Sequence, residues 1–279
     1  MKNKFSIALW VVTIGGIGYS LAVRPNASQD GGNISVSKPV QVPSTNPTPA
    51  LPIQVQRVER TWPNKYQFKE HSLTTTVAGA EVEAEYPQIP GPAHPRVRKF
   101  NRWIRAKVLG YVAQFKRVAR INNRHGRLVE MGLDLSSKVF YSNDNLISMR
   151  LTHRLMEAGQ THPINYYETL NYDLNLNRPL RAKDVFKKGY LRVLSKYSRK
   201  WLSEHYPIQG EFQEGTTPKV SNFTNWNLVS DGIFLSFEDY QVGPHSFGQP
   251  EFTVPYAELK KVLKPTKRWE GCCGETARR

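Results

Sequence analysis

The sequence predicts an α+β fold, a mixed or antiparallel sheet with one long basic helix packed on it and shorter helices beside it. Apolar residues alternate with polar ones from Leu73 to Glu85, as along a half-buried strand. Apolar residues then recur at steps of three and four over 97–118, which is the period of a helix. Two β-rich runs, Trp226–Val229 and Ile233–Phe237, flank Asp231-Gly232, a pair that suits the positive φ angles of a hairpin turn.

Length and composition indicate a globular domain with appended segments. The chain has 279 residues, of which 39% are hydrophobic, enough for a core. We expect the domain at 66–264, in two sub-parts of about 66–125 and 126–264. Cys272 and Cys273 are the two cysteines, and adjacent cysteines form only a strained vicinal bridge or a bond to another chain. The fold therefore does not rest on disulfides, and the role of this pair stays open.

The first 23 residues have the pattern of an export signal. Lys2 and Lys4 precede an apolar run from Phe5 to Val23, and Ser20-Leu-Ala22 supplies small residues for cleavage. The run is about 19 residues long, so an uncleaved membrane anchor fits it as well. We expect an exported protein, periplasmic or extracellular, that is either cleaved here or anchored to the membrane by this segment.

Two further segments lack the composition of a packed core. Residues 24–60 are rich in Pro, Ser, Asn, Thr and Gly and contain no aromatic residue. Such a segment buries too little apolar surface to offset the entropy of ordering the chain, so we interpret it as a linker. Residues 265–279 form a basic tail outside the domain.

The predicted long helix has an apolar inner face and a basic outer face. The inner face comprises Val97, Phe100, Ile104, Val108, Tyr111, Phe115 and Val118. Eleven basic residues and no acidic one lie between Arg96 and Arg127, and the predicted basic patch consists of Arg98, Arg102, Arg105, Lys116 and Arg120. A patch of this density attracts anionic lipids, anionic envelope polymers or an acidic protein face. Export argues against nucleic acid as a partner, and a face that only keeps the protein soluble is the alternative.

The remaining elements follow the helix in order. We expect strands at 128–131, 145–152, Tyr166–Leu174 and Phe252–Val254, and helices at Leu191–His205 and Tyr256–Leu263. Lys138-Val-Phe-Tyr141 separates the first two of these strands, and Pro255 stands at the start of the closing helix.

Motifs for metal, cofactor or nucleophile chemistry are missing from the sequence. The seven histidines form no His-Glu-x-x-His and no His-x-His, so we predict no metal site. No Gly-x-Ser-x-Gly elbow or phosphate loop occurs, and we predict no cofactor. The carboxylates Glu168, Asp173, Glu238 and Asp239 leave one enzymatic alternative, a cell-wall polysaccharide hydrolase with a paired acid and base.

Several short motifs occur in the order of a known family. The C-terminal motif comprises Phe237, Tyr240, Val242, Gly243, Pro244, Gly248, Val254, Pro255, Tyr256 and Leu259. Earlier motifs are Tyr86–Ile89, Phe100-Asn101, Tyr141–Ser148, Gly159 with His162-Pro163, and Asn171–Leu174. Residues 73–263 thereby resemble the extracytoplasmic domain shared by RsiV-type anti-sigma factors and PdaC-type peptidoglycan deacetylases. His245 departs from the pattern, which usually has a tyrosine at this place.

The resemblance implies a non-enzymatic recognition domain, and binding residues concentrate in loops such as those with His162 and His245. The candidate binding residues are His162, Asn171, Asp173, Tyr240 and His245. We expect the loop with Gly159 and His162 to lie beside the loop with Gly243, Pro244, His245 and Gly248. The expected ligand is a cell-envelope polysaccharide or an anionic polymer. The resemblance to RsiV implies a lysozyme-like protein instead, which the net charge of +16 disfavours because such a ligand is itself basic.

Overall fold

The structure is a computed structural model that describes residues 10–14, 17–21, 61–92, 94–124, 131–156, 163–206 and 214–265. It divides into two compact units, Met1–Gln54 and Val55–Arg279. In the first unit, β1 (Trp10–Ile14) and β2 (Ile17–Leu21) form an antiparallel pair. Within these ranges no helix is long and apolar enough to span a bilayer. Cleavage or anchoring at residues 1–23 stays a prediction, and the linker at 24–60 and the tail beyond 265 lie outside the described residues.

The second unit is built on a mixed six-stranded sheet of order β3-β4-β5-β6-β7-β8. The strands are β3 (Lys69–Val77), β4 (Ala80–Gln88), β5 (Gly132–Ser142), β6 (Leu146–Met156), β7 (Ile164–Asp173) and β8 (Arg178–Pro179). β4 and β5 are parallel, and every other pair of neighbours is antiparallel. A parallel pair needs a crossover connection, which α1 (Pro95–Arg124) supplies. The predicted α+β class is confirmed.

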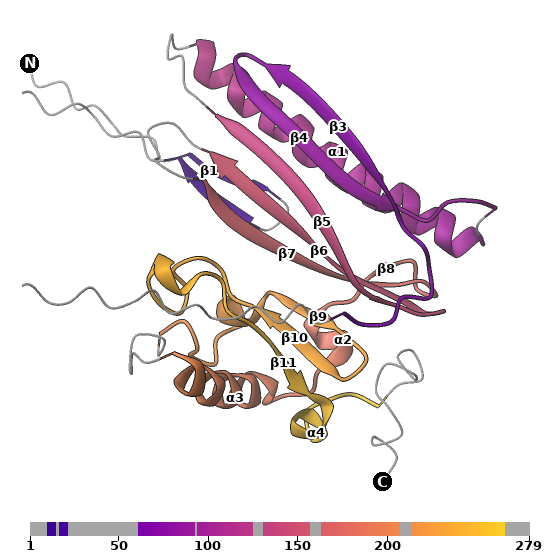
Figure 1. The fold of residues 1–279 in the computed structure, drawn as a ribbon, viewed down its shortest axis with the longest axis vertical. Coiled ribbons are helices and arrows are strands. Elements are labelled where there is room, and N and C mark those ends of the chain that lie inside the picture. The colour runs from indigo at the N-terminus through magenta and orange to yellow at the C-terminus, as the bar shows by residue number, and fades with distance from the viewer. Residues whose placement is uncertain are drawn as a thin grey trace, which may run out of the picture. The chain divides into compact units, whose positions relative to one another are not determined.

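Helix α1 runs along one face of the six-stranded sheet (Figure 1). Phe100, Ile104 and Val108 are fully buried in this contact. The ring centroid of Phe100 lies 5.2 Å from that of Tyr172 on β7. Six of the seven predicted inner-face residues are buried, since a helical period of 3.6 residues places these side chains on one stripe, and Val118 is half-buried.

A three-stranded sheet of order β11-β10-β9 covers part of the opposite face of the six-stranded sheet. Its strands are β9 (Trp226–Leu228), β10 (Gly232–Ser236) and β11 (Glu251–Pro255). The Asn227 side chain donates to the Ser148 hydroxyl and the Met149 carbonyl of β6. The far side of the small sheet is covered by α3 (Tyr190–His205), whose Trp201 stacks on Phe252 at 4.3 Å. The short helices α2 (Ala182–Val185) and α4 (Tyr256–Leu259) complete this layer.

The alternating segment at Leu73–Glu85 is a hairpin rather than a single strand. Ala78 and Gly79 turn the chain with positive φ angles of 50° and 79°, a region that glycine enters without steric cost. The inward residues have odd numbers in β3 and even numbers in β4, because the two-residue turn shifts the phase of alternation by one position. The sequence pattern shows the alternation on both sides but does not mark this turn.

Two other boundaries also differ from prediction. Lys138–Tyr141 lies inside β5, which pairs with β6 along its length and has an irregularity between Val139 and Tyr141. Of the strand expected at 128–131, residues 128–130 lie outside the described residues. The closing helix ends at Leu259 rather than Leu263, because Leu263 bridges to Phe186 and the Lys264 amide donates to the Val185 carbonyl.

The predicted hairpin at 226–237 is confirmed, but Gly232 is required there for a reason other than a positive φ angle. β9 and β10 pair antiparallel, with Ile233 opposite Leu228. Gly232 is not among the residues with positive φ. A Cβ atom at this position would lie 2.2 Å from the Val254 carbonyl oxygen, so the close approach of β11 requires the glycine.

Candidate functional surfaces

The solvent face of α1 carries most of the predicted basic patch. Arg98, Arg102, Arg105 and Arg120 are exposed, and the neighbouring Lys99 and Arg117 are exposed with them. Lys116 is half-buried, and its ammonium lies 3.4 Å from the Thr75 hydroxyl. Among the described residues, no ion pair reaches Lys99, Arg102, Arg105, Arg117 or Arg120. The helix therefore presents a row of uncompensated positive charges to solvent.

One cation of α1 points inward instead. The Lys107 ammonium lies 2.8 Å from Glu168 Oε1 on β7, and the Tyr111 hydroxyl donates to Glu168 Oε2 at 2.5 Å. His153 Nε2 of β6 lies 3.9 Å from the same oxygen. Burial raises the pKa of Glu168, but His153, Lys107 and Tyr111 together outweigh that effect and hold its pKa below the ordinary value. This cluster ties the middle of α1 to the sheet.

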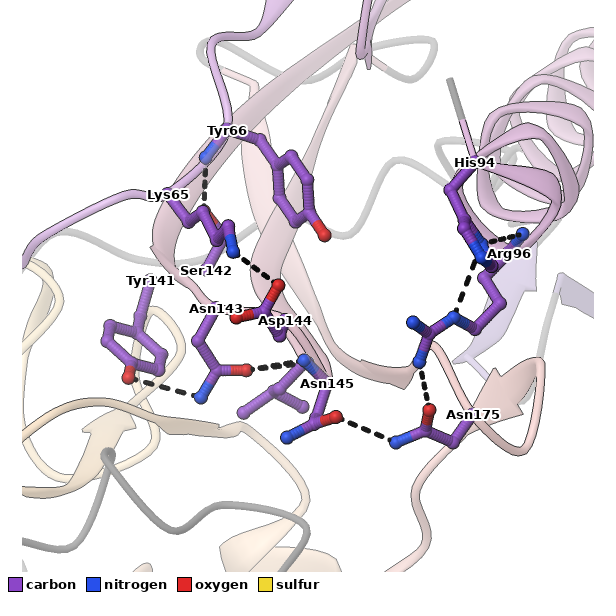
Figure 2. A network of polar contacts seen from close by, with 11 residues as sticks. Lys65, Tyr66, His94, Arg96, Tyr141, Ser142, Asn143, Asp144, Asn145 and Asn175 are labelled. Carbon is purple, nitrogen blue, oxygen red and sulfur yellow. Dashed lines mark hydrogen bonds and ion pairs between the residues drawn. The ribbon is translucent and has the colours of Figure 1, made fainter.

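The start of α1 is tied to two turns of the sheet, as Figure 2 shows. The Arg96 guanidinium donates to the Asn175 side chain, which donates in turn to Asn145 Oδ1 at 2.9 Å. Asn145 belongs to the β5–β6 turn and Asn175 to the β7–β8 turn. Arg96 is thus a positioning residue for the helix and differs from Lys99, Arg102 and Arg105, which no ion pair reaches in the described residues.

Strand β4 carries carboxylates on the face that points away from α1. Glu81, Glu83 and Glu85 are exposed and alternate with Val82 and Ala84, which are buried beneath the helix. Asp134 of β5 lies opposite Glu83 in the parallel register. β4 therefore presents a row of carboxylates on the side away from the cations of α1, while Arg154 of β6 lies opposite Asp134 on the same face.

The predicted binding residues Asn171 and Asp173 are engaged inside the protein. The Asn171 side chain donates to the Trp226 carbonyl and accepts from the Ser148 hydroxyl and the Leu228 amide, so it joins the two sheets. Asp173 Oδ1 accepts two backbone amides of the following turn. Both side chains are almost fully buried, at 3% and 1% exposure. Buried polar groups with all these partners hold the fold together.

The remaining predicted binding residues are Tyr240, His245 and His162, which belong to loops. Tyr240 is 56% exposed and has a φ of +62°, an uncommon backbone conformation for a residue other than glycine. His245 begins a short 3-10 turn (His245–Phe247), and its side chain lies outside the described part of the structure. Gly159 and His162 also lie outside it, so the shared loop site stays a prediction.

The start of β7, which follows the loop with Gly159 and His162, contacts the segment 238–249. The backbone amides of Asn165 and Tyr167, at the start of β7, donate to Asp239 Oδ2 and Glu238 Oε1 at 3.5 and 3.4 Å. The Tyr167 hydroxyl donates to Gln249 Oε1. The segment 238–249 therefore lies against β7 close to where β7 begins, and covers backbone amides that an edge strand would otherwise expose.

Two of the four candidate catalytic carboxylates lie on opposite faces of the six-stranded sheet. Glu168 faces α1, whereas Asp173, five positions along the same strand, lies on the other face, because side chains alternate along a strand. The pKa of Glu238 is raised above its ordinary value, chiefly by burial and further by the neighbouring Asp239. Hydrogen bonds from Asn225 and the Tyr167 amide offset only part of this increase. In the described ranges no three His, Cys, Asp or Glu side chains gather as a metal site.

Sequence reasoning missed Arg150, which lies between the two sheets. Its guanidinium sits 3.8 Å from the Tyr167 ring centroid and 5.4 Å from that of Phe140. It donates to the Ser236 hydroxyl at 2.8 Å and pairs with Glu251. One signal was present, a charged residue inside the apolar run of β6.

Comparisons with known proteins agree with this architecture. Residues 183–257 match a family model described as a protein of unknown function (DUF3298). A stretch of 111 residues is 32% identical to the peptidoglycan-N-acetylmuramic acid deacetylase PdaC of Bacillus subtilis (strain 168). Parts of this chain are therefore similar to the DUF3298 family and to PdaC. The match to PdaC covers 38% of this chain and 24% of PdaC, so the chain spans about a quarter of that relative.

Two solved structures are similar to this chain in fold. A DUF3298 family member from Bacteroides fragilis NCTC 9343 has a TM-score of 0.50 at 17% identity and covers 73% of this chain and 96% of its own. A DUF3298 family protein from Pseudomonas aeruginosa PAO1 has a TM-score of 0.50 at 18% identity, with 74% and 96% covered. The family model includes Tyr240 and His245, whereas α1 lies before residue 183. The basic face thus belongs to the part of the domain outside that model.

Proposed function

We propose that this chain is an exported, non-enzymatic recognition module that binds an anionic polymer of the cell envelope through the solvent face of α1. The observation that carries the proposal is the row of exposed cations, Lys99, Arg102, Arg105, Arg117 and Arg120, that no carboxylate pairs in the described residues. Unpaired cations along one face create a positive potential that draws in polyanions.

The anchoring of α1 supports a recognition role for its outer face. The Lys107–Glu168 contact and the Arg96–Asn175 contact hold the helix on the sheet at its middle and its start. A rigid helix presents its cations without ordering a loop on binding, which lowers the entropic cost of association. Most of these cations are arginines, whose planar guanidinium donates two parallel hydrogen bonds to one phosphate or carboxylate.

The envelope as the place of binding rests on other features. Lys2 and Lys4 precede an apolar run that suits export, either with cleavage or with retention at the membrane. The relative PdaC is by its name an enzyme of peptidoglycan. We propose accordingly that the folded domain works outside the cytoplasm, beside the glycan and its attached anionic polymers, and that nucleic acid is not its ligand.

A sedimentation experiment tests the proposal. Purified peptidoglycan, with and without its attached anionic polymers, is incubated with native protein and with the Arg102→Gln, Arg105→Gln, Arg120→Gln triple variant at low and high salt. We expect native protein to sediment with the polymer-bearing material and to be released by salt, because exposed charges beyond about 8 Å are screened near physiological ionic strength. The triple variant should stay in the supernatant.

A matched control separates a local effect from loss of net charge. Lys188, Arg192 and Lys196 are exposed on or beside α3, and changing all three to glutamine removes the same charge from another surface. This control should sediment like native protein. Equal sedimentation of native protein and the α1 triple variant at both salt concentrations would refute binding through α1.

The carboxylates of β4 favour a second candidate, a basic lysozyme-type protein as ligand. Glu81, Glu83 and Glu85 form an exposed acidic row on the side away from α1, so a basic partner can dock there despite the positive net charge. Calorimetric titration with a basic lysozyme should give a measurable Kd for native protein and at least tenfold weaker binding for the triple glutamine variant of this row. No heat of binding with native protein would reject this candidate.

A further inference from the structure

The cations on the solvent face of α1 fall into two clusters. The N-terminal cluster consists of Arg98, Lys99, Arg102 and Arg105, and the C-terminal cluster consists of the exposed Arg117 and Arg120 with the half-buried Lys116 beside them. Building on the proposed function, we infer that the ligand of α1 is an extended anionic polymer chain that the helix holds at two separate points, one at each cluster.

The spacing along the helix sets the length of the ligand. At 1.5 Å per residue, the N-terminal cluster spans about 10 Å, the gap from Arg105 to Lys116 is about 16 Å, and the whole row spans about 33 Å. The gap is about twice the screening length of 8 Å at physiological ionic strength. A compact anion therefore senses one cluster alone, while an extended chain neutralises both.

The helix surface between the clusters bears no exposed charge. Its exposed residues are Ala106, Leu109, Gly110 and Ala113, and Lys107 in the same stretch is turned toward Glu168. A Cβ atom at Gly110 would meet nothing within 4 Å, so no neighbouring element covers this stretch. The surface between the clusters is thus open for a chain to pass over it, and binding energy comes from the two ends.

A membrane surface fits this helix less well than a polymer does. An interfacial helix inserts its apolar face among the lipid chains, whereas the apolar face of α1 is already buried against the sheet through Phe100, Ile104 and Val108. The large apolar residues that α1 exposes are Leu109 and Ile121, at 37% and 46%. Two partly exposed side chains offer little surface for insertion, so the contact is electrostatic and follows the cation row.

Two-point attachment has a measurable consequence. Once one cluster holds a chain that also reaches the second, the second contact is intramolecular, and the overall affinity exceeds that of either cluster by about 100-fold or more. Long-chain inorganic polyphosphate extends over the whole row, whereas tripolyphosphate is too short to join the clusters. The ratio of their affinities, compared per phosphate unit at equal ionic strength so that the number of binding registers on the long chain does not count, reports the bridging.

The experiment measures Kd for both probes with three proteins. These are the native full chain, an N-terminal cluster variant (Arg98→Gln, Arg102→Gln, Arg105→Gln) and a C-terminal cluster variant (Lys116→Gln, Arg117→Gln, Arg120→Gln). We expect native protein to bind the long chain about 100-fold more tightly than tripolyphosphate. Either variant should lose most of this advantage while still binding tripolyphosphate through its remaining cluster. Thermal unfolding of both variants checks that they are folded.

Each other outcome contradicts a defined part of the inference. If one cluster variant binds the long chain like native protein, the two-point mode is wrong although polymer binding through α1 stands. If vesicles with anionic headgroups bind more tightly than the long chain, a membrane is the partner. If native protein binds neither phosphate probe, the inference fails, and the peptidoglycan sedimentation decides the proposed function separately.

Discussion

Replacement of Glu168 tests how α1 is held on the sheet. The Glu168 side chain is 14% exposed and pairs with Lys107, whose side chain is 21% exposed. Removing one partner of a fully buried ion pair costs about 3–5 kcal/mol, and the partial exposure of Lys107 lets water offset some of this. We expect Glu168→Gln to lower the free energy of unfolding by about 2 kcal/mol, which for a domain of this size lowers Tm by about 4–8 °C.

A double-mutant cycle assigns the loss to the contact itself. Lys107→Met alone should also be destabilising, because it leaves the Glu168 carboxylate with Tyr111 and His153 as its remaining partners. The two changes together should cost about 1–2 kcal/mol less than the sum of the single changes, as for residues in direct contact. Urea unfolding followed by circular dichroism provides the four free energies. Glu258→Gln, at an exposed carboxylate, is the matched control and should change stability by less than about 0.5 kcal/mol.

The same variant has a defined pH dependence. Because the pKa of Glu168 in the folded state lies below its ordinary value of 4.5, its stabilising contribution is complete above that value. The contribution is lost as the pH falls through the lowered pKa of the folded state. The gap in unfolding free energy between native protein and Glu168→Gln should be constant near neutral pH and close in acid. A gap below about 0.5 kcal/mol at neutral pH, or one that widens in acid, would refute this account of the cluster.

Three further predictions concern the second layer. Glu238→Gln should raise the free energy of unfolding at neutral pH by up to about 1 kcal/mol, because burial raises the pKa of Glu238 and penalises its ionised form. This gain should vanish as the pH falls through the raised pKa. If urea unfolding shows that the gain persists in acid, burial of the ionised carboxylate is not its cause. Asn171→Leu should cost about 3 kcal/mol or more by thermal unfolding, because it leaves the buried amide of Leu228 and other groups without their partner; a loss below about 1 kcal/mol would mean that Asn171 does not join the sheets. Gly232→Ala should lower Tm by several degrees, since its Cβ would meet the Val254 carbonyl oxygen at 2.2 Å; calorimetry showing an unchanged Tm would exclude this clash.

The sequence by itself determined the elements that depend on local periodicity. The long helix follows from apolar side chains at steps of three and four, and Phe100, Ile104 and Val108 are buried as that pattern requires. The hairpin around Gly232 follows from two β-rich runs joined by a short turn. The basic character of α1 is also visible in the sequence, because no acidic residue interrupts the run from Arg96 to Arg127.

The tertiary structure decided which polar residues face solvent. Arg105 and Lys107 are two positions apart in one basic run, but Arg105 is exposed while Lys107 reaches a carboxylate on β7. Asn171, a candidate binding residue from the motif, forms hydrogen bonds with the backbone of Trp226 and Leu228 in the small sheet. Periodicity is a property of neighbouring residues and can be read along the chain. A polar side chain is buried or exposed according to partners that folding brings from distant strands, and a single sequence does not record those partners.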